Sequence, residues 1–442
     1  MTGTLLDAGV VRHAAVEALR RNDLGTMTTA APSLYPHQWS WDAAFVAIGL
    51  ARLDVARAVT ELRSLLAAQW STGMIPHIRF SPHADAYFPG PDRWGTDDVA
   101  ARPAGIRTSG ICQPPVHAIA VRHVLDRGRE RGGADRVTAE AFAAESLDAL
   151  LAWHRWLAAA RDPDGAGLVE IHHSWESGFD NSPRWDAPYA RITPGPVPPF
   201  ARRDTHHVAS AAERPTDVEY TRYLWLVEQL KAVGYDEARA LETIDFRVRD
   251  VFFSAVLAAA AEVLGGIADD LGRPDDAADQ LAVAARFRAG VASTVDPATG
   301  LARDYDVRAG AWMGPMTVAG FAPLVAGGDQ ALLAAQRALL RGPDWMAHPA
   351  LRHALPTSTS PASPDFRPRT YWRGPVWPFL NLLLGWACAR DGAFALHDEL
   401  RTASLEQLAD LTFAEYYEPV TGAPLGSHDQ AWTAAAALEW LG

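Results

Sequence analysis

Apolar residues recur every three to four positions along most of the chain, which is the spacing of one buried face of an α-helix. The same segments are rich in Ala, Leu and Arg, which favour helix. Convincing strand patterns are scarce, and 167–173 and 301–307 are expected to be short hairpin pieces. The pattern therefore predicts an all-α protein, with helices over residues 5–21, 41–52, 55–69, 115–126, 139–161, 217–232, 243–271, 275–291, 328–341, 376–388, 393–411 and 428–441.

Three similar turns each follow a long helical segment, at 162–165, 296–300 and 418–422. In each turn a carboxylate and a proline open the bend, and a glycine closes it with a backbone angle that other residues resist. A closed ring of helix pairs, six inner and six outer, would produce this rhythm. The alternative is chance recurrence of a common turn.

Three long irregular stretches interrupt the helices, at 80–113, 175–215 and 349–375. Loops longer than about 15 residues in a compact domain are usually lids or binding loops. No linker divides the chain, so we expect one domain over 1–442, with these loops lying over its active-site end.

The composition of the chain argues against nucleic acid and membranes as partners. The chain has 442 residues, 48% of them hydrophobic, so it can bury a large core. A formal charge of −13 argues against a nucleic-acid partner, and no dense Lys/Arg cluster suggests a membrane surface. The most apolar segment, 251–268, is interrupted by Glu262 and two glycines, which favours a buried helix over a membrane span.

The first residues lack the basic and apolar regions of a secretory signal, and the only cysteines are Cys112 and Cys388. Two free, buried thiols in a reducing cytoplasm are the expected state, so the predicted location is cytoplasmic. A homo-oligomer is compatible with the sequence.

Zinc-binding, redox, phosphate-binding and serine-hydrolase motifs are all missing, and we expect neither a cofactor nor a metal. Tryptophan is abundant instead, with 16 in the chain. Indole faces stack on sugar rings. An aromatic-lined pocket is therefore expected from the tryptophans in irregular segments or at their borders: Trp39, Trp41, Trp94, Trp175, Trp185, Trp372, Trp377 and Trp432.

Residues 173–185 fit neither a helix nor a strand. Two tryptophans there bracket Glu176, Gly178 and Asp180, and an apolar wall raises a carboxyl pKa. This mixture suits a general acid acting on a carbohydrate. The alternative is a surface loop whose tryptophans fill the core and whose Asp180 caps a turn.

Cleavage of a glycosidic bond without a metal usually requires a protonated and an ionised carboxyl group. Asp180 suits the acid, and Glu415 or Glu418 suits the base. Glu418 opens one of the three turns, so a structural role explains it, and we choose Glu415. Asp42 either binds sugar hydroxyls or satisfies free N–H groups in the first turn of its helix.

Four segments of the chain are distinctive: Trp-Ser-Trp-Asp at 39–42, Ser-Gly-Phe-Asp-Asn-Ser-Pro-Arg-Trp at 177–185, Tyr-Trp-Arg-Gly-Pro-Val-Trp at 371–377 and Glu-Tyr-Tyr at 415–417. Together they resemble glycoside hydrolase family 63, and within it the short bacterial glucosylglycerate and mannosylglycerate hydrolases. The similarity runs from about residue 35 to 432.

This resemblance implies an (α/α)6 barrel and an inverting mechanism, with Asp180 as general acid and Glu415 as general base. It also implies a sugar subsite, which we extend with the aromatic residues Trp39, Trp175 and Trp432. The residues that the resemblance itself assigns to this subsite are Trp41, Asp42, Gln113, Gly178, Tyr371, Trp372, Trp377 and Gln430.

Glycerate carries a carboxylate, so its subsite should offer a cation or several hydroxyls. Arg214 is the best candidate, Tyr35 and Tyr87 can donate phenolic hydroxyls, and His77 is expected to assist. The alternative is a surface Arg214 paired with Glu213.

These inferences predict an inverting hydrolase of a small, carboxylate-bearing α-glycoside, with glucosylglycerate slightly preferred over mannosylglycerate. Two alternatives stay open. One is an α-glucosidase or trehalase-like hydrolase of another small α-glycoside. The other is a catalytically silent sugar-binding protein.

Overall fold

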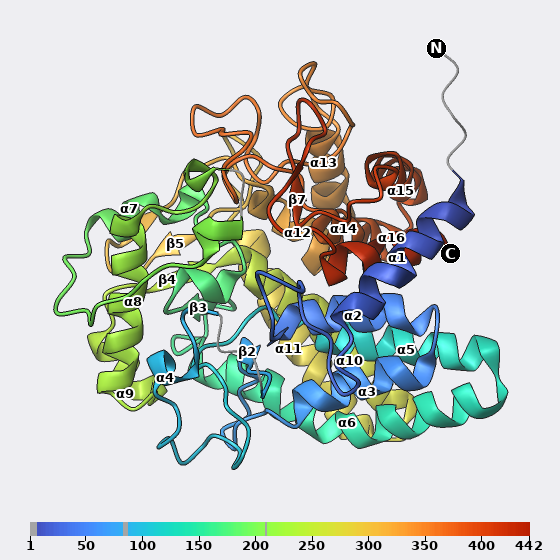
Figure 1. Cartoon of the computed structure of the whole chain (residues 1–442), viewed down its shortest axis with the longest axis horizontal. Coiled ribbons are helices and arrows are strands. Elements are labelled where there is room, and N and C mark those ends of the chain that lie inside the picture. The colour runs from blue at the N-terminus through green and yellow to red at the C-terminus, as the bar shows by residue number, and fades with distance from the viewer. Residues whose placement is uncertain (1–6, 83–86, 208–209) are drawn as a thin grey trace.

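The computed structural model describes residues 7–82, 87–207 and 210–442, and confirms the helical prediction (Figure 1). Leu5 and Leu6 of the first predicted helix lie outside the described residues. The helices are α1 (Ala8–Asn22), α2 (Ser40–Ala51), α3 (Val55–Leu66), α4 (Pro91–Trp94), α5 (His117–Arg131), α6 (Gly133–Ala160), α7 (Asp186–Ala190), α8 (Asp217–Ala232), α9 (Glu237–Thr243), α10 (Val251–Asp270), α11 (Pro274–Ser293), α12 (Ala322–Ala326), α13 (Gln330–Leu340), α14 (Pro378–Arg390), α15 (Phe394–Leu408) and α16 (Ala431–Trp440).

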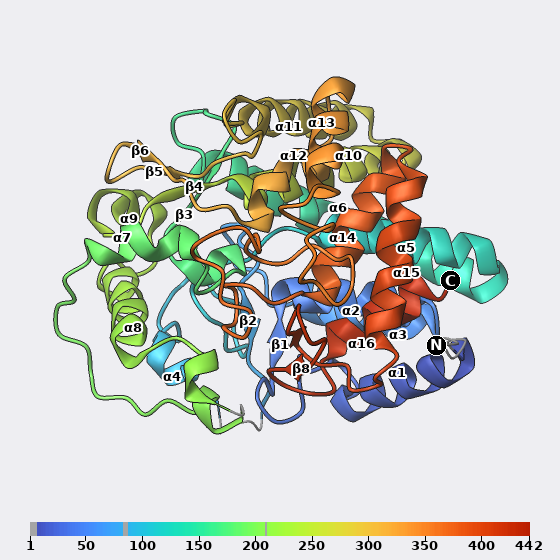
Figure 2. The ribbon, with the colours of Figure 1, turned by 90° about the horizontal axis from the view of Figure 1, so that it is seen from above.

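Within the described part of the chain, six helices form a closed inner ring. Following the chain, α2, α5, α10, α12, α14 and α16 each pack on the next, and α16 returns to α2. A second helix lies outside each member: α3 on α2, α6 on α5, α11 on α10, α13 on α12, α15 on α14 and α1 on α16 (Figures 1 and 2). This is an (α/α)6 barrel.

Burial separates the two layers. Every residue of α2 is buried, whereas α13 in the outer layer buries only Leu333, Gln336 and Leu340. A helix that is apolar all round belongs inside, and one with a single apolar stripe belongs on the surface. Inner helices also approach closely, because a Cβ atom on Gly49 of α2 would lie 2.4 Å from the Cα atom of Ala435 in α16.

Helix α10 is long and apolar enough to cross a membrane by length and composition alone. In this fold it belongs to the inner ring, and 83% of its apolar window is buried against the neighbouring helices. Cys112 and Cys388 are free and buried, as predicted.

The predicted helix 243–271 begins too early. Residues 248–250 form strand β4 (Val248–Asp250), and the Asp250 carboxylate accepts the N–H groups of Phe252 and Phe253 at 2.8 and 2.9 Å. This cap fixes the start of α10. Helix α15 also ends before 411, because Leu411 has a left-handed backbone with φ of 61°.

A four-stranded antiparallel sheet has the order β3 (Val169–Ile171), β4, β5 (Tyr305–Asp306), β6 (Ala311–Trp312). Strands β5 and β6 form a hairpin, but β3 pairs with the distant β4, so the hairpin prediction at 167–173 is wrong. The other strand pairs are β1 (Gln38–Trp39) with β2 (Ile78–Arg79), and β7 (Tyr416–Tyr417) with β8 (Pro424–Leu425).

The three similar turns follow the outer helices α6, α11 and α15. The Glu418 carboxylate accepts the backbone N–H groups of Val420 and Thr421 at 3.1 and 2.6 Å, which confirms its turn role. Loops surround a cavity at the end of the barrel at which α2, α14 and α16 begin.

Candidate active site

A cavity of about 800 Å³, its mouth included, lies where four inner helices begin. Trp41 and Asp42 occupy the first turn of α2, Gln113 precedes α5, Trp372 precedes α14, and Gln430 is the N-cap residue of α16. Every residue assigned from the sequence to catalysis or to a subsite lines this cavity except Trp377. The lining includes Tyr35, Trp39, Trp41, Asp42, His77, Tyr87, Gln113, Trp175, Gly178, Asp180, Arg214, Tyr371, Trp372, Glu415, Gln430 and Trp432.

The loop carrying Asp180 leaves a short 3-10 turn at Ser174–Ser177 and bends at Gly178. Gly178 has φ of 75°, and a Cβ atom there would lie 2.3 Å from the Trp41 ring, so only glycine fits. Beyond the bend, Asn181 accepts the backbone N–H of Trp372 at 3.0 Å. Two distant segments of the cavity wall are thereby joined.

Asp180 is suited to hold a proton near neutral pH. Burial, and then the charge of Glu415, raise the pKa of Asp180 to about 7. Its Oδ2 atom accepts a hydrogen bond from the Tyr371 hydroxyl at 3.4 Å. Asp180 thus does not act merely as a turn cap, since its side chain lies on the cavity wall.

Glu415 lies just before β7 and is only 2% exposed. Its Oε1 atom accepts from the Tyr35 hydroxyl at 2.9 Å. Its Oε2 atom accepts from Arg214 at 2.7 Å and from the backbone of Ser427 at 3.1 Å. These donors hold an ionised carboxylate in a fixed orientation.

Arg214 is buried, so the alternative of a surface arginine paired with Glu213 is wrong. Glu213 instead accepts from Arg369 at 2.6 Å. Besides Glu415, Arg214 donates to the Tyr35 hydroxyl at 2.8 Å, and its guanidinium carbon lies 4.4 Å from the centroid of the Tyr371 ring. Among the described residues, its Nε atom has no hydrogen-bond partner.

Asp42 is a further carboxyl group on the cavity wall and is more buried than Asp180. Burial raises its pKa well above the ordinary value, and the charges of Glu415 and Asp180 add to this effect. Beside it, the rings of Trp41 and Trp432 line the cavity, and Phe379 packs behind them at 4.7 Å from Trp41 and 4.1 Å from Trp432.

The expected sugar contact of Trp377 is not supported by its position. Its ring stacks on Trp372 with centroids 3.7 Å apart and planes 2° from parallel, and it is 1% exposed behind the cavity wall. Trp377 is the N-cap residue of α14, so the start of that helix turns it toward the core. It supports Trp372 rather than facing the cavity. Trp94 and Trp185, also expected around the pocket, are likewise buried outside its lining.

The residues expected near glycerate all line the cavity. Tyr87 packs edge-on against Trp39, with centroids 5.1 Å apart. His77 bonds to Ser109 at 2.6 Å, and burial, followed by His173, lowers the pKa of His77 to about 3. His77 is therefore neutral, and Arg214 supplies the positive charge.

Sequence reasoning missed several wall residues: Ala30, Phe88, Asp204, Pro215, Tyr220 and Tyr223. Tyr220 and Tyr223 are one turn apart on α8, a spacing that sequence patterns also show for ordinary core residues. Asp204 lay within the predicted loop 175–215, but without an aromatic neighbour in sequence to single it out.

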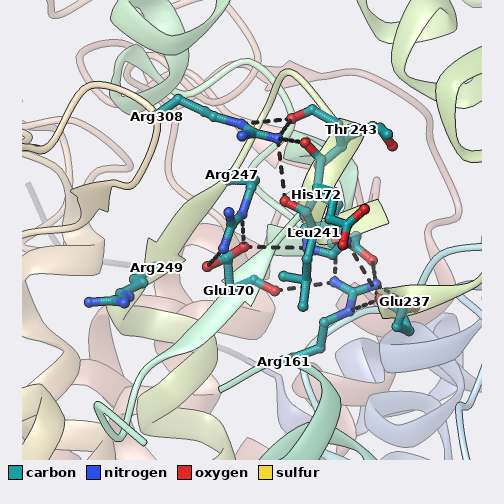
Figure 3. Close-up of polar contacts among 12 residues, drawn as sticks. Arg161, Glu170, His172, Glu237, Leu241, Thr243, Arg247, Arg249 and Arg308 are labelled. Carbon is teal, nitrogen blue, oxygen red and sulfur yellow. Dashed lines mark hydrogen bonds and ion pairs between the residues drawn. The ribbon is translucent and has the colours of Figure 1, made fainter. Parts of the chain in front are cut away.

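A buried ion-pair network supports the Asp180 loop from behind. Both terminal nitrogens of Arg161 donate to Glu176 at 2.9 Å, and Glu176 also accepts the backbone N–H groups of His172 at 2.6 Å and Cys112 at 3.3 Å. On its other side Arg161 pairs with Glu237 at 2.8 Å (Figure 3). Glu176 thus connects the Asp180 loop to the segment carrying Gln113.

An aromatic cavity that places a protonated and an ionised carboxyl group at one end of an (α/α)6 barrel defines a glycoside hydrolase. The comparisons with known proteins agree. Residues 35–433 match the model of the mannosylglycerate hydrolase MGH1-like glycoside hydrolase domain, and the chain belongs to this family.

Three relatives show the extent of the similarity. Glucosylglycerate hydrolase from Mycolicibacterium hassiacum is 54% identical over 97% of both chains. Mannosylglycerate hydrolase from Thermus thermophilus is 40% identical over 96% of this chain and 99% of its own. The crystal structure of a family 63 mannosylglycerate hydrolase from the same species, in complex with Tris and D-glycerate, superposes with a TM-score of 0.88, at 39% identity over 97% of this chain and 99% of that one.

Proposed function

We propose that this enzyme hydrolyses the α-glycosidic bond of glucosylglycerate, with inversion, to glucose and glycerate. The observation that carries the proposal is the meeting of Asp180, Glu415 and the buried cation Arg214 in one cavity. The 54% identical relative is a glucosylglycerate hydrolase, which supports this substrate over mannosylglycerate. A related crystal structure contains glucose, and another contains D-glycerate.

In the proposed reaction, Asp180 gives its proton to the glycosidic oxygen as the bond to the anomeric carbon breaks. Glu415 removes a proton from a water molecule that attacks the opposite face of the sugar ring. Attack from that face inverts the configuration. Asp42, Gln430 and the tryptophan rings bind the sugar ring by hydrogen bonds and stacking.

The glycerate moiety lies near the mouth in this proposal. Tyr35 and Tyr87 are partly exposed there, while Trp41 and Trp432 are buried below. Arg214 lines the cavity, so its guanidinium can attract the glycerate carboxylate while it keeps its bond to Glu415.

Turnover of a small substrate panel tests the proposal. We expect the highest kcat/KM for glucosylglycerate, a lower value for mannosylglycerate, and little hydrolysis of trehalose. Proton NMR at early times should show the β-anomer of glucose first. Failure to hydrolyse either glycerate glycoside would reject the proposed substrate, and preferred cleavage of trehalose would favour a trehalase-like enzyme.

Asp180→Asn and Glu415→Gln should each lower kcat by a factor on the order of 10² to 10⁴, because each removes one proton-transfer step. Glu418→Gln is the matched control, since it changes a buried carboxylate three residues from Glu415 that bonds only its own turn. We expect it to keep near-normal kcat. Full turnover in both site variants, with sugar still bound, would indicate a different set of catalytic groups.

A further inference from the structure

A chain of hydrogen bonds runs between the two carboxyl groups through two phenols. The Tyr371 hydroxyl donates to Oδ2 of Asp180 at 3.4 Å and lies 3.5 Å from the Tyr35 hydroxyl. The Tyr35 hydroxyl donates to Oε1 of Glu415 at 2.9 Å. Three contacts within hydrogen-bonding distance thus join the proposed acid to the proposed base. Each phenol carries one proton, so the middle contact becomes a hydrogen bond when Tyr35 directs its proton to Tyr371 and accepts one from a protonated Glu415.

Both phenols are held in place by their surroundings. The Tyr371 ring packs between Trp377 and Tyr416, with centroids 5.4 and 5.6 Å away. The Tyr35 ring packs edge-on against Trp39 at 5.2 Å, and its hydroxyl accepts a hydrogen bond from Arg214. Burial raises the pKa of both phenols well above the ordinary value, so each remains a neutral hydroxyl that can accept one proton and release another.

The inverting reaction, if Asp180 and Glu415 act as proposed above, leaves the enzyme in the wrong protonation state for the next cycle. Asp180 has become a carboxylate, and Glu415 has become a carboxylic acid. Before another substrate can be cleaved, Glu415 must lose a proton and Asp180 must gain one.

We propose that Tyr35 and Tyr371 return this proton. The Glu415 proton moves to the Tyr35 oxygen, the Tyr35 proton moves to the Tyr371 oxygen, and the Tyr371 proton moves to Oδ2 of Asp180. Three O–H bonds break and three form. Both phenols end neutral, so the transfer needs no other reactant.

The charges around the chain favour this direction. Arg214 donates to Glu415 at 2.7 Å and stabilises a negative charge there. At the other end, burial is the largest effect on the pKa of Asp180 and raises it, which favours the protonated form. The ion pair with Arg214 and the burial of Asp180 thus both favour transfer from Glu415 to Asp180.

Kinetics of Tyr35→Phe and Tyr371→Phe test the relay, using the substrate that the enzyme turns over best. The single-turnover rate constant, measured with enzyme in excess, reports chemistry without the return step, whereas kcat includes it. We expect the ratio of kcat to the single-turnover rate constant to fall at least fivefold below the wild-type ratio. Imidazole, a diffusible proton carrier, should restore kcat without changing the single-turnover rate constant.

Tyr416→Phe is the matched control. It removes a buried phenol hydroxyl beside Glu415 that has no hydrogen-bond partner among the described residues, and Tyr416 does not line the cavity. Its kinetic ratio should equal that of the wild type.

The double variant gives a second criterion. Breaking either link of a serial chain stops transfer, so Tyr35→Phe/Tyr371→Phe should lower the ratio no more than the more damaging single variant. Additive losses, an unchanged ratio, or a kcat that imidazole does not restore would overturn the relay. Failure of the relay can be distinguished from failure of the proposed acid and base roles. If those roles are wrong, Asp180→Asn and Glu415→Gln would both keep full turnover.

Discussion

At the scale of single residues, the site depends on two carboxyl groups kept in opposite protonation states. Asp180 accepts a hydrogen bond from the Tyr371 hydroxyl, and the charge of Glu415 contributes to its raised pKa. Glu415, in contrast, forms a direct ion pair with Arg214. The same guanidinium lowers the pKa of Asp180 through space, against the larger effect of burial. Arg214 therefore influences both carboxyl groups.

The dependence of kcat/KM on pH should reveal the protonation of Asp180 and the influence of Arg214 on it. The general acid acts only when protonated, so on the alkaline side kcat/KM should decline as pH rises through the Asp180 pKa of about 7. Arg214→Met removes the cation that lowers this pKa and should move the alkaline limb to higher pH. Arg222→Met, which loses only a bond to the carbonyl of Ile192, is the control. A limb that stayed in place or moved to lower pH in Arg214→Met would contradict the assignment.

The sequence identified Asp180 and Glu415 because residue type and irregular surroundings already distinguish them from structural carboxylates. It could not distinguish a tryptophan facing the cavity from one stacked behind it, as Trp377 is, because that choice depends on where the first turn of α14 points. Asp204 and Tyr220 were missed for a related reason. They join the wall only through tertiary packing of a loop and of α8.

At the scale of elements, the Asp180 loop is held by an ion pair rather than by regular structure. Glu176→Gln should destabilise the fold by about 3 kcal/mol, because it removes a partner from a buried charge pair. It should also lower kcat, since Glu176 ties the Asp180 loop to Cys112. Denaturant unfolding and steady-state kinetics check both effects.

Glu237→Gln is the control for this network. It touches the same Arg161, but the Glu237 side chain is 20% exposed, and its contact toward the Asp180 loop is only with the Nδ1 atom of His172, at 3.6 Å. We expect a loss of about 1 kcal/mol or less and an unchanged kcat. Equal effects on kcat in the two variants would show that Glu176 does not position the loop.

Element boundaries were harder to predict than element types. The apolar period placed α10 in the right region, but it did not reveal that residues 248–250 pair with β3. Arg247 and Arg249 alternate with apolar residues there and pair with Glu170 and Asp164, partners distant in sequence. Local periodicity contains no information about such partners.

At the scale of the whole molecule, the barrel closes because small residues let neighbouring inner helices meet. Gly49→Ala should destabilise the protein by about 1–3 kcal/mol, since the new methyl group would meet the backbone of Ala435. Gly266→Ala is the matched control on α10. It has open space around it and should be neutral or stabilising by up to about 1 kcal/mol. Thermal or denaturant unfolding measures both, and equal stability of the two variants would contradict close packing of α2 on α16.

The buried rings of Trp41 and Trp432, with Phe379 packed behind them, have a consequence for the order of events after bond cleavage. With these rings at the inner end of the cavity, both products should depart through the opening by which the substrate entered. In the proposed binding mode glycerate lies nearer that opening, so it should depart first and the hexose should follow. Glucose should then inhibit competitively and glycerate noncompetitively, and the reverse pattern would reveal a second way out.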